Sequence, residues 1–359
     1  MELKTNLIAL LLCYFISHSK SQLIQQSTCI TPTGEIGRCI NILDCQPIIN
    51  IINGNSITTD IRLQLQKYFC GYDGTTTKVC CPNTLTLPQS NNASLLPTVD
   101  CGQAEALVRI TNGDRADLLE FPWQAALKYV SKKAIPYSCG ASLINKRYVL
   151  TAAHCITPNL IGVRLGEYDF LTPVDCVTIR GVTTCAPPHQ DFDVTKADAT
   201  IHPSYQIATL GFDIALIRLR KDAVFNKAVK PVCLPITESL TPKSLKNLLV
   251  VGWGRTEYGR PSSVLLKAAV PYEENNVCIK QVPVTIFDSQ LCTSVQDGKD
   301  SCNGDSGGPI MTAVNVNGVI KTVQVGLVSY GPARCGQFYP GIYTRLSSYT
   351  KWIMDNVKP

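Results

Sequence analysis

The sequence predicts an all-β protein in which antiparallel β-barrels follow a small disulfide-rich domain. After residue 101, short apolar runs such as 148–151, 214–217 and 325–328 alternate with Gly, Pro and Asn turns, as in all-β barrels. Before them, six cysteines fall within residues 29–81, a density typical of domains whose apolar core is too small to hold them together. Only residues 348–357 have helical spacing, so we expect one closing helix.

The N-terminus has the pattern of a secretory signal peptide. A charged start is followed by an apolar run over 7–16 and by small residues that suit cleavage. The run is too short to span a bilayer, which takes about 20 apolar residues. We therefore expect a signal peptide over 1–21 and a secreted, extracellular chain without a membrane span.

Cysteine usage agrees with export. One of the 17 cysteines, Cys13, lies in the leader, and the even number that remains suits disulfides in an oxidising compartment. Metal binding is the alternative, but the paired Cys-x-x-Cys and His-x-x-x-His spacings of zinc sites are missing. A net charge of +6 without a Lys/Arg block argues against nucleic-acid binding.

Two segments precede the β-rich part. Residues 22–81 form the small domain, whose cysteine connectivity the spacing leaves open. Residues 82–109, rich in Asn, Thr, Ser and Pro, are expected to form an exposed linker and activation segment. The linker carries an N-glycosylation sequon at Asn92.

The run from Gly304 to Gly308 places Ser306 among glycines, next to Asp305. A serine hydroxyl becomes a nucleophile when a base takes its proton and nearby donors receive the charge that develops on the substrate oxygen. Glycines leave the hydroxyl uncovered and let backbone N–H groups approach a substrate. For so short a motif, a buried glycine-rich turn is the alternative.

A base and a carboxylate are available elsewhere. His154 ends a strand-like run beside Cys155, and Asp213 opens the apolar run 214–217. Taken singly, they could be a core histidine and a turn aspartate. His189 and His202 lie in Pro-flanked segments and are expected to have no catalytic part. The order His154, Asp213, Ser306 is that of chymotrypsin-type enzymes.

Residues 151–155, 213–216 and 304–309 resemble the three active-site blocks of chymotrypsin-like (S1) serine proteases, and the resemblance extends over 110–359. It implies two six-stranded antiparallel β-barrels with the active site in the cleft between them. Ser306 would be the nucleophile, His154 the general base, and Asp213 the residue that orients the imidazole. Backbone N–H groups of Gly304 and Ser306 would form the oxyanion hole.

The same resemblance gives a substrate pocket. Asp300 lies six residues before the nucleophile, where the family places the floor of the primary pocket. A carboxylate there favours cationic side chains, because an apolar one would leave it buried and unpaired. Ser301 adds a hydrogen-bonding group, and Gly331 and Gly341 leave room for a long side chain. We expect cleavage after Arg or Lys. The alternative is that Asp300 belongs only to a surface turn.

An activation site is also implied. Residues 108–113 resemble the family's activation sequence, so cleavage after Arg109 would free the α-amino group of Ile110. That ammonium would pair with Asp305 and organise the oxyanion hole and pocket. A missing buried partner typically costs about 3–5 kcal/mol, so the precursor should be largely inactive.

The six-cysteine domain, with its adjacent Cys80 and Cys81, resembles the clip domain of arthropod clip-domain serine proteases. One pair, Cys176 and Cys185, would staple a surface loop, as in the phenoloxidase-activating and Easter-like branch. The resemblance implies the disulfides Cys29–Cys80, Cys39–Cys70, Cys45–Cys81, Cys101–Cys233, Cys139–Cys155, Cys278–Cys292, Cys302–Cys335 and Cys176–Cys185.

No cofactor is required for this chemistry, but a structural Ca²⁺ is considered. Residues 166–167 resemble the start of the trypsin calcium loop, and Glu167, Asp169 and Asp191 offer hard oxygen ligands. Solvated surface acids are the competing interpretation.

The sequence thus predicts a secreted serine endopeptidase zymogen of an extracellular cascade in melanisation, Toll-type signalling or innate immunity. Its expected partners are an upstream activating protease, a downstream zymogen or pro-protein substrate and a serpin inhibitor. A catalytically weak clip-domain adaptor is the alternative from another class, and a digestive trypsin is disfavoured by the clip domain.

Overall fold

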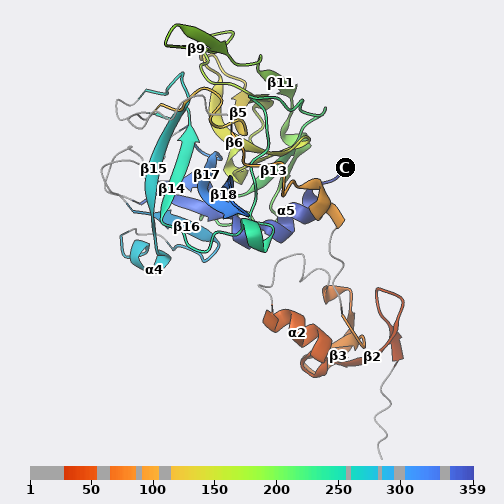
Figure 1. Cartoon of the computed structure of the whole chain (residues 1–359). Coiled ribbons are helices and arrows are strands. Elements are labelled where there is room, and N and C mark those ends of the chain that lie inside the picture. The colour runs from red at the N-terminus through yellow and green to blue at the C-terminus, as the bar shows by residue number, and fades with distance from the viewer. Residues whose placement is uncertain are drawn as a thin grey trace, which may run out of the picture. The chain divides into compact units, whose positions relative to one another are not determined.

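The computed structural model describes residues 28–54, 65–85, 91–104, 115–255, 260–281, 285–294, 304–331 and 340–359. The chain divides into an N-terminal unit, Met1–Gln89, and a C-terminal unit, Ser90–Pro359. Figure 1 shows both units. No helix in the described ranges has the length and apolar character needed to cross a membrane.

In its described residues the N-terminal unit has a four-stranded antiparallel sheet and an α-helix over Gln46–Gly54. The strand order is β1-β2-β4-β3. Its core is small, with Cys45, Ile48, Tyr68 and Val79 buried, which explains why disulfides must hold it. Its elements are β1 (Thr28–Ile30), β2 (Ile36–Asn41), η1 (Ile42–Asp44), α2 (Gln46–Gly54), β3 (Phe69–Asp73) and β4 (Thr76–Cys81).

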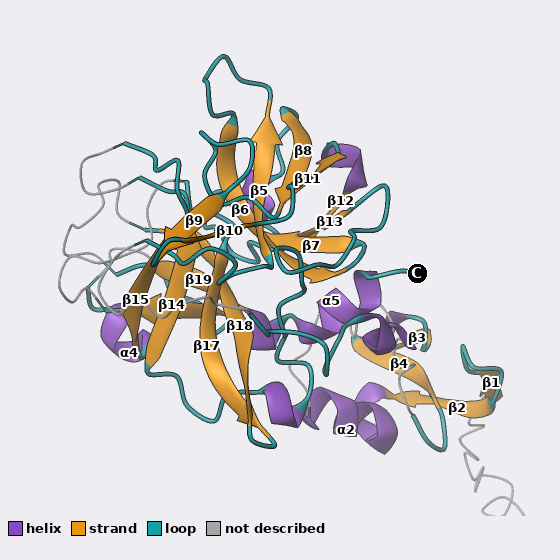
Figure 2. Cartoon of the chain, turned by 45° about the horizontal axis from the view of Figure 1, so that its top comes forward, coloured by secondary structure: helices purple, strands orange, loops and turns teal. Residues whose placement is uncertain are grey.

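In its described residues the C-terminal unit has two large antiparallel sheets, seen as separate groups of strands in Figure 2, and a small two-stranded sheet. The first has the order β11-β8-β5-β6-β7-β13-β12. Its strands are β5 (Gln124–Tyr129), β6 (Tyr137–Asn145), β7 (Tyr148–Thr151), β8 (Leu160–Leu165), β11 (Gln190–Asp193), β12 (Ala199–Ile201) and β13 (Ala215–Arg218).

The second sheet is a closed barrel, β14-β15-β16-β19-β18-β17. Alternating apolar residues fill it, with Leu248, Val270, Leu291 and Tyr343 buried inside. Its strands are β14 (Asn247–Gly252), β15 (Leu266–Glu273), β16 (Gln290–Thr293), β17 (Pro309–Val316), β18 (Val319–Tyr330) and β19 (Ile342–Arg345).

These features confirm the all-β fold, with one difference. The first sheet is open rather than a closed six-stranded barrel, because its short edge strands β11 and β12 lie at opposite ends of the order. A disulfide-closed hairpin of β9 (Cys176–Ile179) and β10 (Val182–Cys185) projects from the unit (Figure 1). The short pieces η3 (Ala153–Cys155), η4 (Lys196–Asp198), η5 (Glu238–Leu240), α4 (Asn275–Cys278) and η6 (Leu346–Ser348) connect strands.

The closing helix is present as α5 (Thr350–Asn356). Its apolar residues Trp352 and Ile353 are buried in the core shared with the first sheet. Helical spacing of these residues is what allows one face to be covered while the other stays in water. The sequence prediction of a C-terminal helix is therefore confirmed.

Within the predicted linker, residues 91–104 stay largely exposed or half-buried but contact the rest of the C-terminal unit at a few points. Leu96 is 3% exposed within its core, and the Asn145 side chain donates to the Leu95 carbonyl at 3.1 Å. Gly102 donates its N–H to the Pro231 carbonyl at 2.9 Å. The segment begins with η2 (Asn91–Leu95), which carries the sequon residue Asn92. Burial of Leu96, these hydrogen bonds and the Cys101–Cys233 disulfide together hold the segment, which composition alone did not indicate.

Candidate active site

His154 is held at the end of β7 by a short 3₁₀ turn, η3. The neighbouring Cys155 is buried and bonded to Cys139 of β6, so the turn cannot swing away from the first sheet. The His154 side chain keeps 24% of its surface exposed. The imidazole is therefore fixed at its base and open to solvent on one side.

Asp213 is the buried partner of this histidine. Its Oδ2 lies 2.8 Å from His154 Nδ1, and its Oδ1 accepts the His154 backbone N–H at 3.0 Å. The Ser329 hydroxyl also donates to Oδ2. A carboxylate with 1% exposure is stable only with such partners. Because the carboxylate is an acceptor, Nδ1 carries the proton and Nε2 is left as the basic nitrogen.

The backbone that presents Asp213 is strained. Phe212, just before it, has φ of +57°, a left-handed conformation that is unfavourable for a bulky residue. Its ring stacks on His202 with centroids 5.1 Å apart, and Ile214 donates its N–H to the Phe212 carbonyl at 2.9 Å. Packing around the ring thus compensates for the strain and fixes the aspartate.

Ser306 lies in a glycine-rich turn before β17, where the two sheets approach each other. Its carbonyl accepts the Gly140 N–H of β6 at 2.8 Å. Gly307 has φ of +75°, and an added Cβ would come within 2.2 Å of Thr151 Oγ1. Only glycine allows this approach between the turn and the end of β7.

His154, Ser306 and Gly304 line one cleft of about 370 Å³ between the two sheets. Position 304 also requires glycine, because its φ is +111°. Three residues that are far apart in the sequence, His154, Asp213 and Ser306, are therefore brought to one place. The arrangement offers a serine hydroxyl, an imidazole oriented by a buried carboxylate, and a backbone turn beside them.

Asp305 points away from the cleft, toward the segment that follows β14. Its Oδ1 accepts the Gly254 N–H at 2.8 Å. A Cβ on Gly252 or Gly254 would meet its carboxylate oxygens at 2.0 and 2.3 Å. The two glycines around Trp253 therefore form a cradle for this carboxylate, a reason for their presence that the sequence alone did not give.

Several predicted site residues lie outside the described residues. They are Arg109 and Ile110 of the activation sequence, Asp300 and Ser301 of the pocket floor, and the cysteines Cys302 and Cys335. The two pocket-wall glycines are described: Gly331 follows β18 and Gly341 precedes β19. Gly341 is held by a hydrogen bond from the Thr293 N–H to its carbonyl, at 3.1 Å.

Between described cysteines the structure contains seven disulfides, with the pairings that the sequence resemblance implies. Two cysteines and His154 lie close enough for a metal, but Cys139 and Cys155 are bonded to each other and are no ligands. The bonds are Cys29–Cys80, Cys39–Cys70, Cys45–Cys81, Cys101–Cys233, Cys139–Cys155, Cys176–Cys185 and Cys278–Cys292.

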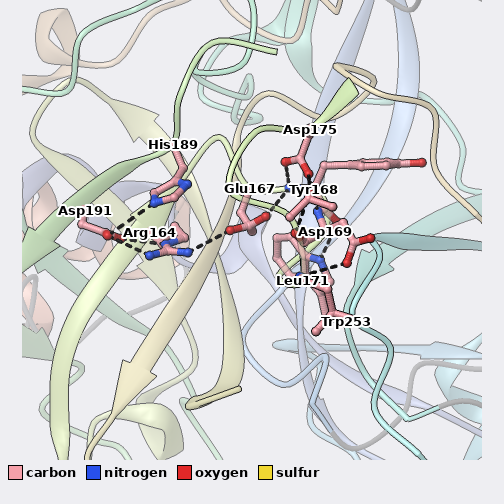
Figure 3. A network of polar contacts seen from close by, with 10 residues as sticks. Arg164, Glu167, Tyr168, Asp169, Leu171, Asp175, His189, Asp191 and Trp253 are labelled. Carbon is pink, nitrogen blue, oxygen red and sulfur yellow. Dashed lines mark hydrogen bonds and ion pairs between the residues drawn. The ribbon is translucent and has the colours of Figure 1, made fainter. Parts of the chain in front are cut away.

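The three acids proposed for calcium do not form a ligand set, because an arginine lies between two of them (Figure 3). Arg164 of β8 donates to Asp191 through Nε and Nη2, both at 2.8 Å, and to Glu167 through Nη1 at 3.0 Å. The Asp169 carboxylate instead accepts the Leu171 N–H at 3.1 Å. The proposed ligand set is therefore corrected, because the guanidinium supplies the positive charge between Glu167 and Asp191, while calcium binding by this loop stays a prediction.

The electrostatics agree with this arrangement. Burial raises the pKa of Glu167, and the nearby Asp175 adds to the rise while Arg164 opposes it. Burial alone would raise the pKa of Asp191, but its hydrogen bonds to Arg164 bring that pKa below its ordinary value. Arg164 crosses from β8 to β11 at the directly paired position, which sequence spacing could not reveal.

Two known protein families match this chain. The family model for trypsin matches residues 110–353, and that for the regulatory CLIP domain of proteinases matches residues 29–81. Serine protease grass of Drosophila melanogaster is 36% identical, with 92% of this chain and 90% of the relative covered. Phenoloxidase-activating factor 1 of Holotrichia diomphalia is 37% identical, with 93% and 94% covered.

A solved structure is similar over nearly the same length. The crystal structure of the Drosophila Grass clip serine protease of the Toll pathway aligns with a TM-score of 0.69 and 34% identity. The alignment covers 92% of this chain and 97% of that chain.

Proposed function

This chain belongs to the trypsin family of serine proteases and carries a clip domain, and from that premise we propose that it is a secreted endopeptidase zymogen which cleaves proteins after Arg or Lys. The observation that carries the proposal is the buried Asp213–His154 pair facing the cleft that Ser306 lines. An apolar pocket alone would favour binding, but a hydroxyl beside an oriented imidazole favours acyl transfer.

The proposed reaction uses these groups in turn. His154 Nε2 takes the proton of the Ser306 hydroxyl as the oxygen attacks the substrate carbonyl, and then gives that proton to the leaving amine. Asp213 keeps the proton on Nδ1 and stabilises the imidazolium that forms. Water then attacks the acyl carbonyl while His154 takes its proton, and the bond to the Ser306 oxygen breaks as that oxygen receives the proton, so the acid product leaves and the enzyme returns to its starting state.

The tetrahedral intermediate needs donors for its oxyanion. We assign the backbone N–H groups of Gly304 and Ser306, two residues that line the cleft. Removing one such donor in other enzymes lowers kcat by about 10²–10³-fold, so this feature accounts for a substantial share of the rate.

Specificity for Arg and Lys rests on Asp300 as the pocket floor, with Ser301 beside it. Gly331 and Gly341, both without side chains, suit a long substrate residue between them. Carboxylate pairing with a guanidinium or ammonium in a narrow pocket is the physical basis of the preference.

Activation is assigned to cleavage after Arg109. The new Ile110 ammonium would join the carboxylate of Asp305, which already accepts the Gly254 N–H. Because Asp305 is the residue before the nucleophile, any change at its side chain reaches the turn that carries Gly304 and Ser306. Cys101–Cys233 would keep the clip domain attached after the cut.

A place in an extracellular immune cascade is proposed from the relatives, whose names include phenoloxidase-activating factors and a Spaetzle-processing enzyme. The partners would be an activating protease, a zymogen or pro-protein substrate and a serpin. The adaptor alternative would be favoured by a replaced Ser306 or His154, and both residues are present.

The test is hydrolysis of reporter peptides ending in Arg, Lys, Phe or Ala, before and after limited cleavage of the purified zymogen. N-terminal sequencing identifies the new chain. Turnover of Arg and Lys reporters that appears with a chain beginning at Ile110 supports the proposal, and Ser306→Ala should abolish it. Release of that chain without turnover would overturn the enzyme assignment in favour of the adaptor.

A further inference from the structure

Three aromatic side chains form one wall of the cleft that holds His154 and Ser306. The rings of Tyr137 and Phe170 stack at a centroid distance of 4.4 Å and an interplanar angle of 13°. Phe170 and Trp253 follow at 5.0 Å and 46°. All three rings line the cleft, together with Ile135 and Pro261, so this wall offers a continuous apolar surface. Below, "aromatic wall" means Tyr137, Phe170 and Trp253.

The position of the wall indicates which part of a substrate it meets. Among described residues, neither Gly331 nor Gly341 of the arginine pocket lines this cleft, and neither does Tyr330 beside them. The substrate residue before the scissile bond occupies that pocket. The part of the substrate that follows the bond must therefore continue from Ser306 on the side away from the pocket. The leaving amine must also reach His154 to be protonated. The wall therefore lies along the segment that follows the scissile bond.

The wall is held in place by Arg164 of β8 and by the loop after this strand; Figure 3 shows Arg164, residues of the loop and Trp253. The Arg164 guanidinium lies over the Tyr137 ring, 5.3 Å from its centroid, while Glu167 and Asp191 fix its direction. A guanidinium over an aromatic face is attractive and limits how the ring can turn.

The other two rings are fixed through the same loop. The Trp253 indole N–H donates to the Tyr168 carbonyl at 3.1 Å. Phe170 donates its backbone N–H to the Ser263 carbonyl at 3.0 Å, and its ring lies between those of Tyr137 and Trp253. Arg164 of β8 and the loop after this strand thus position the three rings.

We infer that the aromatic wall is a specificity-determining subsite for bulky apolar side chains at the two positions after the scissile bond, and that Arg164 is its positioning residue. The inference rests on the proposed function and adds a substrate requirement to it. Burial of such a side chain against the rings is favourable in proportion to the apolar area covered. Lys133 also lines the cleft, so basic side chains at these positions are disfavoured by like charge.

The test uses internally quenched peptides that are identical except after the arginine, where they continue Leu-Leu, Gly-Gly or Lys-Lys. A short arginine reporter without any following residue is measured alongside. For the activated enzyme we expect kcat/KM for Leu-Leu to exceed that for Gly-Gly by about tenfold, the lower end of what a side chain in an apolar pocket gives. Lys-Lys should be the poorest substrate.

Three variants and two matched controls locate the effect. Phe170→Ala should bring the Leu-Leu to Gly-Gly ratio to about threefold or less. Arg164→Gln should lower the ratio in the same direction, and Arg164→Lys, which keeps a cation near Tyr137, should retain more of it. The controls are Phe225→Ala, a partly exposed phenylalanine outside the cleft, and Arg220→Gln, whose pair with Asp198 is at the surface; both should keep the parent ratio.

The outcomes separate the two claims. An activated enzyme that hydrolyses no arginine peptide overturns the proposed function and this inference with it. An enzyme that hydrolyses the short reporter but treats Leu-Leu and Gly-Gly alike overturns the inference alone, as does a parent ratio that survives Phe170→Ala. If Arg164→Gln lowers turnover of every substrate by one common factor, its role is general stability and the positioning assignment fails.

Discussion

Acid should destabilise the C-terminal unit through His202, a residue with no proposed part in catalysis. Its side chain is buried among the rings of Phe212, Tyr349 and Trp352, with centroid distances of 5.1, 5.4 and 5.3 Å. Burial lowers the pKa of His202 from 6.5 to about 4, because the imidazolium would lose its hydration. Its Nδ1 also accepts the Ser204 N–H at 3.2 Å, which a protonated ring could not do.

The direction of the effect follows from the lowered pKa. The unfolded chain takes up a proton near pH 6.5, whereas the folded chain resists it until pH 4. The contribution of His202 is therefore fully present above pH 6.5 and is lost as the pH falls toward 4. Each pKa unit corresponds to about 1.4 kcal/mol, so the loss approaches about 3 kcal/mol. Because Phe212 stacks on this ring, protonation also loosens the turn that carries Asp213.

Urea unfolding of the Ser306→Ala zymogen at pH 7 and pH 4.5, followed by tryptophan fluorescence, measures this loss without self-cleavage. Between the two pH values the parent should lose about 2.5 kcal/mol more unfolding free energy than the His202→Gln variant. His189→Gln is the control, since His189 is partly exposed beside Asp191, and it should behave as the parent does. Equal losses in the parent and in His202→Gln would refute the reasoning.

Three further outcomes are expected. Asp213→Asn should leave the protein folded but lower kcat on an arginine reporter by about 10⁴-fold, because the imidazole loses its tautomer preference; retention of most activity would contradict the assigned role. Gly307→Ala should lower the melting temperature sharply or prevent secretion, since the added Cβ meets Thr151 Oγ1 and the Gly140 carbonyl at 2.2 and 2.7 Å; a parent-like melting temperature counts against the close approach. Chelation with EDTA should leave the melting temperature unchanged. Arg164→Gln should instead lower the unfolding free energy by about 3 kcal/mol, because it leaves Glu167 buried without its ion pair. A Ca²⁺-dependent melting temperature in the parent argues against the arginine as the resident cation.

The parts of the site that could be predicted from the sequence are those written in contiguous residues. Ser306 among its glycines and His154 beside Cys155 are local patterns, and their chemistry follows from residue type. The barrel strands could be predicted for the same reason, because alternation and turn residues act within a few positions. The C-terminal helix followed from the spacing of Trp352, Ile353 and Val357.

The rest depended on how distant segments meet. Arg164 and Asp191 are 27 residues apart and become partners only through the β8–β11 register. The acidic residues of the loop suggested a cation site. Arg164 on β8 instead places a guanidinium between Glu167 and Asp191. The aromatic wall joins Tyr137, Phe170 and Trp253 from three separate segments, and no window of the sequence contains it. Likewise, the linker composition gave no sign that Leu96 would be buried.

The central claim is that Ser306 is a nucleophile activated by His154 and enabled by cleavage after Arg109. The most direct measurement is labelling with an arginine-containing phosphonate that reacts with activated serines, followed by intact mass and peptide mapping. We predict one adduct per chain on Ser306 after activation, with little labelling of the zymogen or of His154→Ala. Labelling on another residue, or the same extent of labelling in all three proteins, would contradict the account.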